Sequence, residues 1–412
     1  MIKYSRHILA NGLTVLVLEE KSTPMVTVNT LYSVGARDES PVRTGFAHLF
    51  EHLMFGGTPE VPDFDRVVTE MGGESNASTN NDITQYYVTA PACSIEEVLR
   101  IESDRMRNLE LSAERLSVQQ SVVTEEYNYR YVNQPYGDVW LLMRPLCYKE
   151  HPYRWCTIGA DIRHVQEATL DDVRPFYDRY YCPANAIVAV AGNVRSDEVM
   201  RLAEKWYGGL PSGCRAGHQH AAEPEQKEGR MLVVERDVPA DALYMAFPTC
   251  GRLDGDMAAT DLVSDILSNG PSSRLYNELV KKRGLFGELD AYNTGDYDPG
   301  LFVIAGKLRD GVSLDEAREG VERELRHIAE SEVNGRELEK VKNKYESTFC
   351  YSQYKTQDCA VAMSYYEWLG HIEWVNTEPQ LYRQVTAEDV RRVASDLFQP
   401  SRQNTLYYKS KQ

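Results

Sequence analysis

The sequence predicts an α+β protein composed of two related domains. Segments with the alternating pattern of strands are interspersed with segments that have the 3.6-residue period of helices. The chain has 412 residues, a length that corresponds to two or three domains. Residues 169–183 resemble residues 386–400, about half a chain later, and a strand-like segment follows each copy. A repeat of this size indicates two homologous domains rather than a solenoid of short repeats.

A polar segment near the middle of the chain is the strongest linker candidate. Residues 211–230 are polar and rich in small side chains, a composition typical of the connections between domains. We therefore expect a first domain at residues 1–215, a linker at 216–230 and a second domain at 231–412.

Local signals justify individual elements along the first half of the chain. Asn11-Gly12 is typical of a hairpin turn, Gly56-Gly57 is expected to end a helix, and Thr169 with Asp172 suits a helix start. The expected elements, in chain order, are strands at 14–18 and 26–32, helices at 44–55 and 64–71, a strand at 83–90, helices at 94–109, 113–131 and 169–180, a strand at 186–191 and a helix at 195–207.

Composition argues against several classes of protein. The net charge of −17 is opposite to the basic footprint of a nucleic-acid-binding protein. No apolar stretch approaches the 18 residues of a membrane span. The N-terminal segment lacks the features of a signal peptide, so we expect a cytoplasmic protein. The eight cysteines form no C-x-x-C motif and are expected to be reduced thiols rather than zinc ligands.

The helix expected at 44–55 contains the pattern His48-Leu-Phe-Glu51-His52. Positions i, i+3 and i+4 share one face of a helix, so these three side chains should point the same way. The rest of the segment is apolar or small, as in a buried helix, where ionisable groups need a compensating role. Two imidazoles one turn apart can bind zinc, and the carboxylate can accept a proton from water. The order His-x-x-Glu-His is itself a metallopeptidase signature.

A zinc site with two histidines requires a third protein ligand if the fourth position is left for water. Glu125 and Glu126, on the helix expected at 113–131, are the candidates within one domain. Spacing alone allows either of them, or another acid.

Residues 74–91 begin with small polar side chains and end as a strand. Two interpretations remain open for the polar half: an ordinary loop, or an edge strand that accepts another chain by backbone pairing.

The chain resembles the pitrilysin/insulinase-type inverzincin metallopeptidases, in particular the half-length bacterial members related to the mitochondrial processing peptidase β subunit. The resemblance covers the whole chain. The matching motifs are Asn11-Gly12-Leu13, Gly35-Ala36-Arg37, residues 45–58, Gly72-Gly73 with Asn76, Ala77, Thr79, Thr84 and Tyr86, then Pro183-Ala-Asn, Gly192-Asn193, Ser272-Ser-Arg-Leu275 and Arg283-Gly-Leu285.

This resemblance implies two homologous α/β-sandwich domains, each with an antiparallel-rich sheet and helices packed on one side, that form half of a peptidase chamber. It implies one Zn²⁺ per chain, bound by His48, His52 and Glu126, and it favours Glu126 over Glu125. Glu51 would be the general base that takes a proton from the attacking water. The edge strand around Asn76, Ala77 and Ser78 would bind the peptide substrate.

The chain departs from the family pattern at positions near the site. An acid is common seven residues before the third ligand, where this chain has Gln119. Active members hold substrate with an arginine and a tyrosine, and here these positions are Val280 and Gly287. We therefore expect a heterodimer in which a homologue without the His-x-x-Glu-His motif supplies the pair. The alternatives are a homodimer, and a non-catalytic assembly subunit that retains a zinc site.

Overall fold

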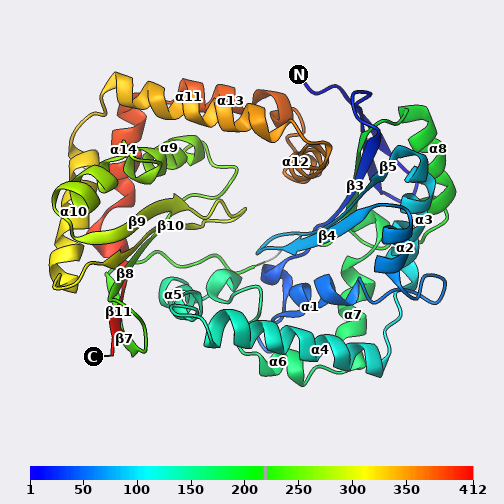
Figure 1. Ribbon diagram of the computed structural model, residues 1–412, viewed down its shortest axis with the longest axis horizontal. Helices are drawn as coiled ribbons and strands as arrows, with labels where there is room; N and C mark the ends of the chain where they lie inside the picture. Colours follow the sequence, from blue (N-terminus) through cyan, green and yellow to red (C-terminus); the bar gives the residue numbers. More distant parts are fainter. Residues whose placement is uncertain (218–219, 412) are drawn as a thin grey trace. The chain divides into compact units, whose positions relative to one another are not determined.

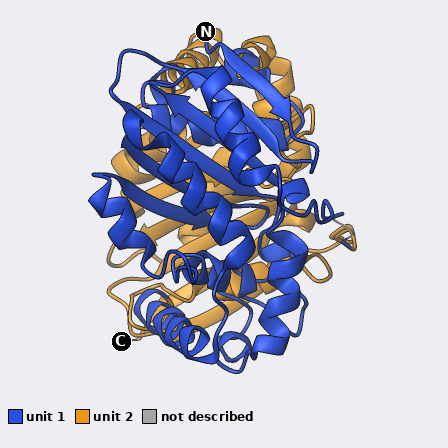
Figure 2. Cartoon of the chain, turned by 90° about the vertical axis from the view of Figure 1, so that its right-hand side faces the viewer, with its two compact units in different colours: residues 1–130, 155–220, 350–377 blue, residues 131–154, 221–349, 378–412 orange. Residues whose placement is uncertain are grey.

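The computed structural model describes residues 1–217 and 220–411 (Figure 1). The chain divides into two compact units, and neither is continuous in sequence (Figure 2). Unit 1 comprises Met1–Arg130, Trp155–His220 and Cys350–Thr377, and unit 2 comprises Tyr131–Arg154, Ala221–Phe349 and Glu378–Gln412. Relative to the expected domain ranges, residues 131–154 lie in unit 2 and residues 350–377 lie in unit 1.

A six-stranded mixed sheet forms the centre of unit 1. Its strands, in spatial order, are β1 (Tyr4–Ile8), β2 (Thr14–Glu19), β6 (Ala186–Gly192), β3 (Met25–Tyr32), β5 (Thr84–Pro91) and β4 (Glu74–Thr79). The β2–β6 pair is parallel and the remaining pairs are antiparallel. The central strand β3 is almost entirely buried, whereas β4 alternates between exposed and half-buried residues. The polar segment is therefore an edge strand rather than a loop.

Helices lie on both faces of the unit 1 sheet. α3 and α8 pack on one face and α12 packs on the other (Figure 1). α7 begins with a capping box formed by Thr169 and Asp172, an arrangement that satisfies free N–H groups at a helix start. The helices are α1 (Phe46–Leu53), α2 (Phe64–Glu70), α3 (Ile95–Asn108), α4 (Ala113–Tyr127), α6 (Arg163–Gln166), α7 (Leu170–Tyr180), α8 (Ser196–Tyr207) and α12 (Thr356–Trp368).

Unit 2 repeats this topology with a five-stranded sheet. Its strands, in spatial order, are β7 (Arg230–Arg236), β11 (Asn404–Ser410), β8 (Ala242–Pro248), β10 (Leu301–Leu308) and β9 (Phe286–Asn293). The parallel pair is β7–β11, in the place of β2–β6, and β9 is the edge strand in the place of β4. The expected α+β fold with two homologous, antiparallel-rich sheets is confirmed. The helices of unit 1 pack on both faces of its sheet rather than on one side, because α12 covers the face opposite α3 and α8.

The helices of unit 2 also show the internal repeat. α14 begins with a capping box of Thr386 and Asp389, which matches the box that starts α7. The helices are α5 (Val139–Cys147), α9 (Met257–Ser268), α10 (Leu314–Glu330), α11 (Gly335–Ser352), α13 (Trp374–Gln384) and α14 (Ala387–Leu397), of which α11 and α13 each contain a boundary between the units. Among the described residues, no helix has the length and hydropathy that a membrane span requires.

Each half of the chain contributes a helix to the unit built mainly from the other half. α5 packs on β7, β8 and β11 of unit 2, and α12 packs on β3 and β6 of unit 1. Polar contacts fix α12: the Trp368 indole donates to Ser33 Oγ at 2.8 Å, and Asn29 Nδ2 donates to Ser364 Oγ at 2.6 Å. The α12 contacts join residues more than 300 positions apart in sequence.

We expect Trp368→Ala to destabilise unit 1 by about 3–5 kcal/mol, the usual cost of truncating a buried tryptophan. Trp368 is 8% exposed and has both packing and a hydrogen bond to lose. Tyr354→Ala is a suitable control because Tyr354 is 89% exposed. Denaturant unfolding of the two variants measures the difference, and equal stabilities would contradict the role assigned to α12.

Candidate metal centre

Helix α1 is fixed at its N-terminal end by a buried carboxylate. Oε2 of Glu39 accepts from the Gly45 N–H at 2.7 Å, and Oε1 accepts from the Ala47 N–H at 2.8 Å. Gly45 has φ +89, and a Cβ there would lie 2.8 Å from the Ile158 carbonyl oxygen. The sequence reasoning missed Glu39, although an acid shortly before a helix start is a recognisable signal.

An aromatic cluster supports the other side of α1. The Tyr86 hydroxyl donates to the Phe50 carbonyl oxygen at 3.1 Å and lies 3.3 Å from the Tyr181 hydroxyl. Phe50 also stacks on Phe176 with ring centroids 5.4 Å apart. Burial raises the pKa of both tyrosines, and the nearby charge of Glu51 adds to the effect. These contacts hold α1 so that its polar stripe faces α4.

The structure brings His48, His52 and Glu126 together where α1 packs against α4. Nε2 of His48 is 3.6 Å from Oε2 of Glu126, and Nε2 of His52 is 3.2 Å from the same oxygen. One ligand atom from each side chain lies within 4.8 Å of the others. Glu125 is exposed and stays outside this cluster.

The donor set fits zinc. Bonds of about 2.0–2.2 Å in a tetrahedron place neighbouring ligand atoms roughly 3.3–3.6 Å apart, close to the two distances from Glu126. Burial lowers the pKa of His48, although the negative charges of Glu126 and Glu51 oppose it. The hydrogen bond from His52 is the main cause that lowers the pKa of Glu126. A neutral imidazole and an ionised carboxylate are the forms that bind a metal.

Glu51 shares the polar stripe of α1 and is half-buried beside the cluster. Its carboxylate lies near enough to His48 to oppose the effect of burial on the pKa of that imidazole. The arrangement therefore places a carboxylate that is not one of the three clustered donors next to them, as a proton acceptor would need.

Arg130 is a second residue that the sequence reasoning missed. Its Nη1 lies 2.9 Å from Oε1 of Glu126, one turn along the helix, in a π-helical segment (Asn128–Val132) that continues α4. Acid and base at i, i+4 are a known pairing signal. The ion pair occupies one oxygen of Glu126 and leaves the other for the histidines. Gln119 lies on the same helix and is half-buried.

The residues expected to bind substrate lie on the edge strand. Asn76, Ala77 and Ser78 belong to β4, which pairs on one side with β5 and packs against α1. Asn76 and Ser78 are exposed. Because β4 is the last strand of its sheet, its outer backbone groups are not used by the sheet.

Neither position of the expected substrate-holding pair carries a polar side chain. Val280 is 7% exposed and belongs to the hydrophobic core of unit 2. Gly287 is exposed on β9, and the nearest atom to a Cβ there would be 3.9 Å away.

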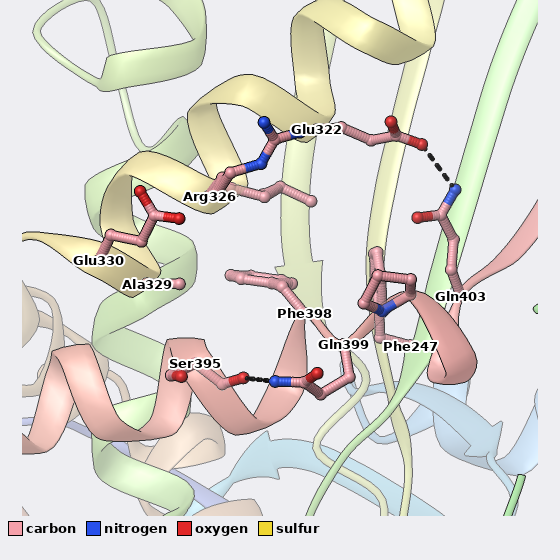
Figure 3. Close-up of a pocket in the computed structure, with 11 residues that line it drawn as sticks. Phe247, Glu322, Arg326, Ala329, Glu330, Ser395, Phe398, Gln399 and Gln403 are labelled. Atoms are coloured by element: carbon pink, nitrogen blue, oxygen red, sulfur yellow. Dashed lines mark hydrogen bonds between the residues drawn. The ribbon is translucent and has the colours of Figure 1, made fainter. Parts of the chain in front are cut away.

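A pocket of about 350 Å³ lies on unit 2 between α10 and the C-terminal end of α14 (Figure 3). Its lining combines aromatic and polar side chains and contains neither histidine nor cysteine: Phe247, Glu322, Leu325, Arg326, Ala329, Glu330, Ser395, Phe398, Gln399, Pro400 and Gln403. Two of its amides are already engaged, since Gln403 donates to Glu322 and Gln399 donates to the Ser395 carbonyl oxygen. This pocket lacks the donor set of a zinc site.

Two family models match different parts of the chain. The model "Insulinase (Peptidase family M16)" matches residues 14–139, which include the cluster, and the model "Peptidase M16 inactive domain" matches residues 167–345. The chain belongs to the peptidase M16 family. The expected resemblance to insulinase-type peptidases is thereby confirmed.

Two relatives named zinc proteases are similar in sequence to most of the chain. Zinc protease PqqE of Helicobacter pylori is 29% identical over 413 residues, covering 99% of this chain and 93% of that protein. A zinc protease of Rickettsia bellii, described as uncharacterized, is 26% identical over 355 residues, covering 84% of this chain and 83% of that protein.

Solved structures share the fold. The crystal structure of a protease from Helicobacter pylori superposes with a TM-score of 0.93 at 29% identity, covering 99% of this chain and all of that one. The periplasmic protease PqqL of Escherichia coli has a TM-score of 0.81 at 19% identity, and the match covers 98% of this chain but 47% of PqqL. The M16 chain described here thus spans about half the length of PqqL.

We expect Glu126→Gln to lower zinc affinity by more than about 100-fold, since even an outer partner of a ligand contributes roughly 10–100-fold. The amide keeps the size of the side chain but removes its charge. Glu125→Gln is the matched control and should leave the affinity unchanged, because Glu125 is exposed and outside the cluster. Competition with a chromophoric chelator measures both variants, and equal affinities would contradict Glu126 as a ligand.

Proposed function

We propose that this M16 chain is a zinc metallopeptidase that hydrolyses peptides or unfolded polypeptide segments, acting as the catalytic subunit of a heterodimer. The observation that carries the proposal is the convergence of His48 and His52 of α1 with Glu126 of α4. Glu51 lies beside them, and α1 packs against the edge strand β4. Relatives that are named zinc proteases support the same reaction class.

Zinc held by the three residues would supply Lewis acidity, which polarises a carbonyl and makes water a better nucleophile. Glu51 accepts a proton from the attacking water as the new C–O bond forms. Glu51 then returns the proton to the nitrogen of the scissile bond as the C–N bond breaks. Because Glu51 is half-buried and has no role as a ligand, its carboxylate is available for this transfer.

An extended peptide would bind by adding a strand next to β4. Backbone pairing holds a substrate with little regard to its side chains, and the small, polar residues Asn76, Ala77 and Ser78 leave the strand accessible. A peptide must be extended to pair in this way, so unfolded segments are better substrates than folded domains.

Glu51→Gln should abolish most peptide cleavage while zinc binding is retained, because the amide cannot accept the proton. General acid–base catalysis contributes about 10²–10⁴-fold, so we expect a loss of kcat in that range. Measuring zinc content alongside cleavage of a quenched fluorescent peptide separates this effect from loss of the metal. A variant that keeps both zinc and full activity would contradict the role of Glu51.

The proposal of a partner subunit follows from two positions of unit 2 that lack a side chain able to donate a hydrogen bond to substrate. A family member normally holds substrate near zinc with an arginine and a tyrosine, and Val280 and Gly287 cannot replace them. We infer that a homologous subunit without the His-x-x-Glu-His motif supplies the pair. A homodimer would not, because each copy would lack the same two side chains.

The isolated chain should therefore cleave peptides poorly, and adding the homologue should raise the rate by about 10²–10³-fold, the usual contribution of a donor that stabilises the transition state. Size-exclusion chromatography with and without the homologue tests the assembly in the same samples. Full activity of the isolated chain would overturn the heterodimer. A wild-type chain that binds no zinc but still assembles with the homologue would instead favour the alternative role of an assembly subunit.

A further inference from the structure

A pair of cysteines in unit 1, Cys182 and Cys214, lies outside the candidate metal centre. Sγ of Cys182, just before β6, is 3.7 Å from the carbonyl oxygen of Cys214. Gly213, the residue before Cys214, passes even closer to this sulfur. A Cβ added to Gly213 would lie 2.4 Å from the sulfur of Cys182. Gly213 has φ +67, a conformation that glycine adopts without strain. Glycine thus allows the chain to pass directly over the thiol.

Hydrogen bonds anchor the chain on both sides of Cys214. Two residues before it, the Ser212 carbonyl oxygen accepts from the Ala184 N–H at 2.9 Å. Two residues after it, the Ala216 N–H donates to Oδ1 of Asn185 at 3.2 Å. Both anchors belong to the turn that follows Cys182, so the backbone of Cys214 is held beside that residue.

The two thiols differ in exposure. Cys182 is 7% exposed and its sulfur also lies 3.9 Å from the Arg179 carbonyl oxygen, whereas Cys214 is exposed. Burial is the main cause that raises the pKa of the Cys182 thiol. A thiolate is the nucleophile in disulfide exchange, so the exposed Cys214 is the sulfur that an external reagent meets first. The 3.7 Å separation between the Cys182 sulfur and the Cys214 carbonyl oxygen keeps the backbone of Cys214 close to that thiol.

We propose that Cys182 and Cys214 are a modification site that closes to an intramolecular disulfide by exchange with a low-molecular-weight disulfide. The Cys214 thiolate attacks one sulfur of the reagent and releases the other as a thiolate, which forms a mixed disulfide. The Cys182 thiolate then attacks the Cys214 sulfur and releases the second half of the reagent. The protein thiols lose two electrons and two protons, and the reagent leaves as two thiols.

The bond would fasten the segment around Cys214 to the start of β6. This segment leads along the chain to Ala221, where unit 2 begins. Arg215, the next residue, is exposed and is a site for trypsin. Closure of the disulfide should therefore slow tryptic cleavage after Arg215.

The test treats the full-length wild-type chain with oxidised glutathione, alkylates the remaining thiols and maps the peptides by mass spectrometry. We expect the peptides that contain Cys182 and Cys214 to be joined, with the loss of two hydrogen atoms and no retained glutathione. In Cys182→Ala, glutathione should stay on Cys214. Cys93, another exposed thiol, is the internal control and should retain glutathione in both proteins.

Two results would overturn the proposal. One is wild-type Cys214 that retains glutathione to the same extent as in Cys182→Ala, since the second exchange would then not occur. The other is Cys214 that does not react while Cys93 does. Because Cys214→Ser alters only an exposed side chain, it provides a folded variant in which protection of Arg215 from trypsin should be lost after the same treatment.

Discussion

The candidate site depends on one contact, the packing of α1 against α4. This contact brings two imidazoles and a carboxylate into a place where water has limited access, and His48 is 8% exposed. Ionisable groups are costly to bury unless each is compensated. Burial favours neutral His48, while His52 and Arg130 favour the charged form of Glu126. Burial of His48 and the partners of Glu126 thus favour the protonation states that a metal requires at these two residues. Glu39 and Tyr86 hold α1 in the position where the donors meet.

Comparison of the two homologous units shows that the candidate metal ligands are specific to unit 1. α9 follows β8 in unit 2 as α1 follows β3 in unit 1, and the two sheets share their topology. Most of the α9 side chains are apolar or small and buried in the core of unit 2. The acid Asp261 on α9 is half-buried and accepts a hydrogen bond from Tyr382 at 2.7 Å, an ordinary way to satisfy a carboxyl group. At the same position of the fold, α1 thus carries candidate metal ligands, whereas α9 serves only to pack the core.

Local sequence patterns predicted which residues of α1 share one face better than they predicted the third ligand on α4. The spacing of His48, Glu51 and His52 placed them on one face of a helix, because the helical period fixes relative directions within an element. Spacing could not choose between Glu125 and Glu126, since that choice depends on how α4 is rotated against α1. The exchange of α5 and α12 between units had no local signal, because its contacts join distant parts of the chain. A topological exchange of this kind follows from the tertiary fold and not from the periodicity of either helix.

The two positions without a donor in unit 2 differ in what their residues do. Gly287 is exposed, and a Cβ there would make only an ordinary contact at 3.9 Å, so a side chain could be added without a clash with the sheet. Val280 packs in the core of unit 2, so an arginine at that place would have to bury a charge or displace its apolar neighbours, which costs more than a surface change. The absence of the arginine is therefore part of how unit 2 is packed rather than an isolated substitution. This packing supports the proposal that another polypeptide supplies the missing donors.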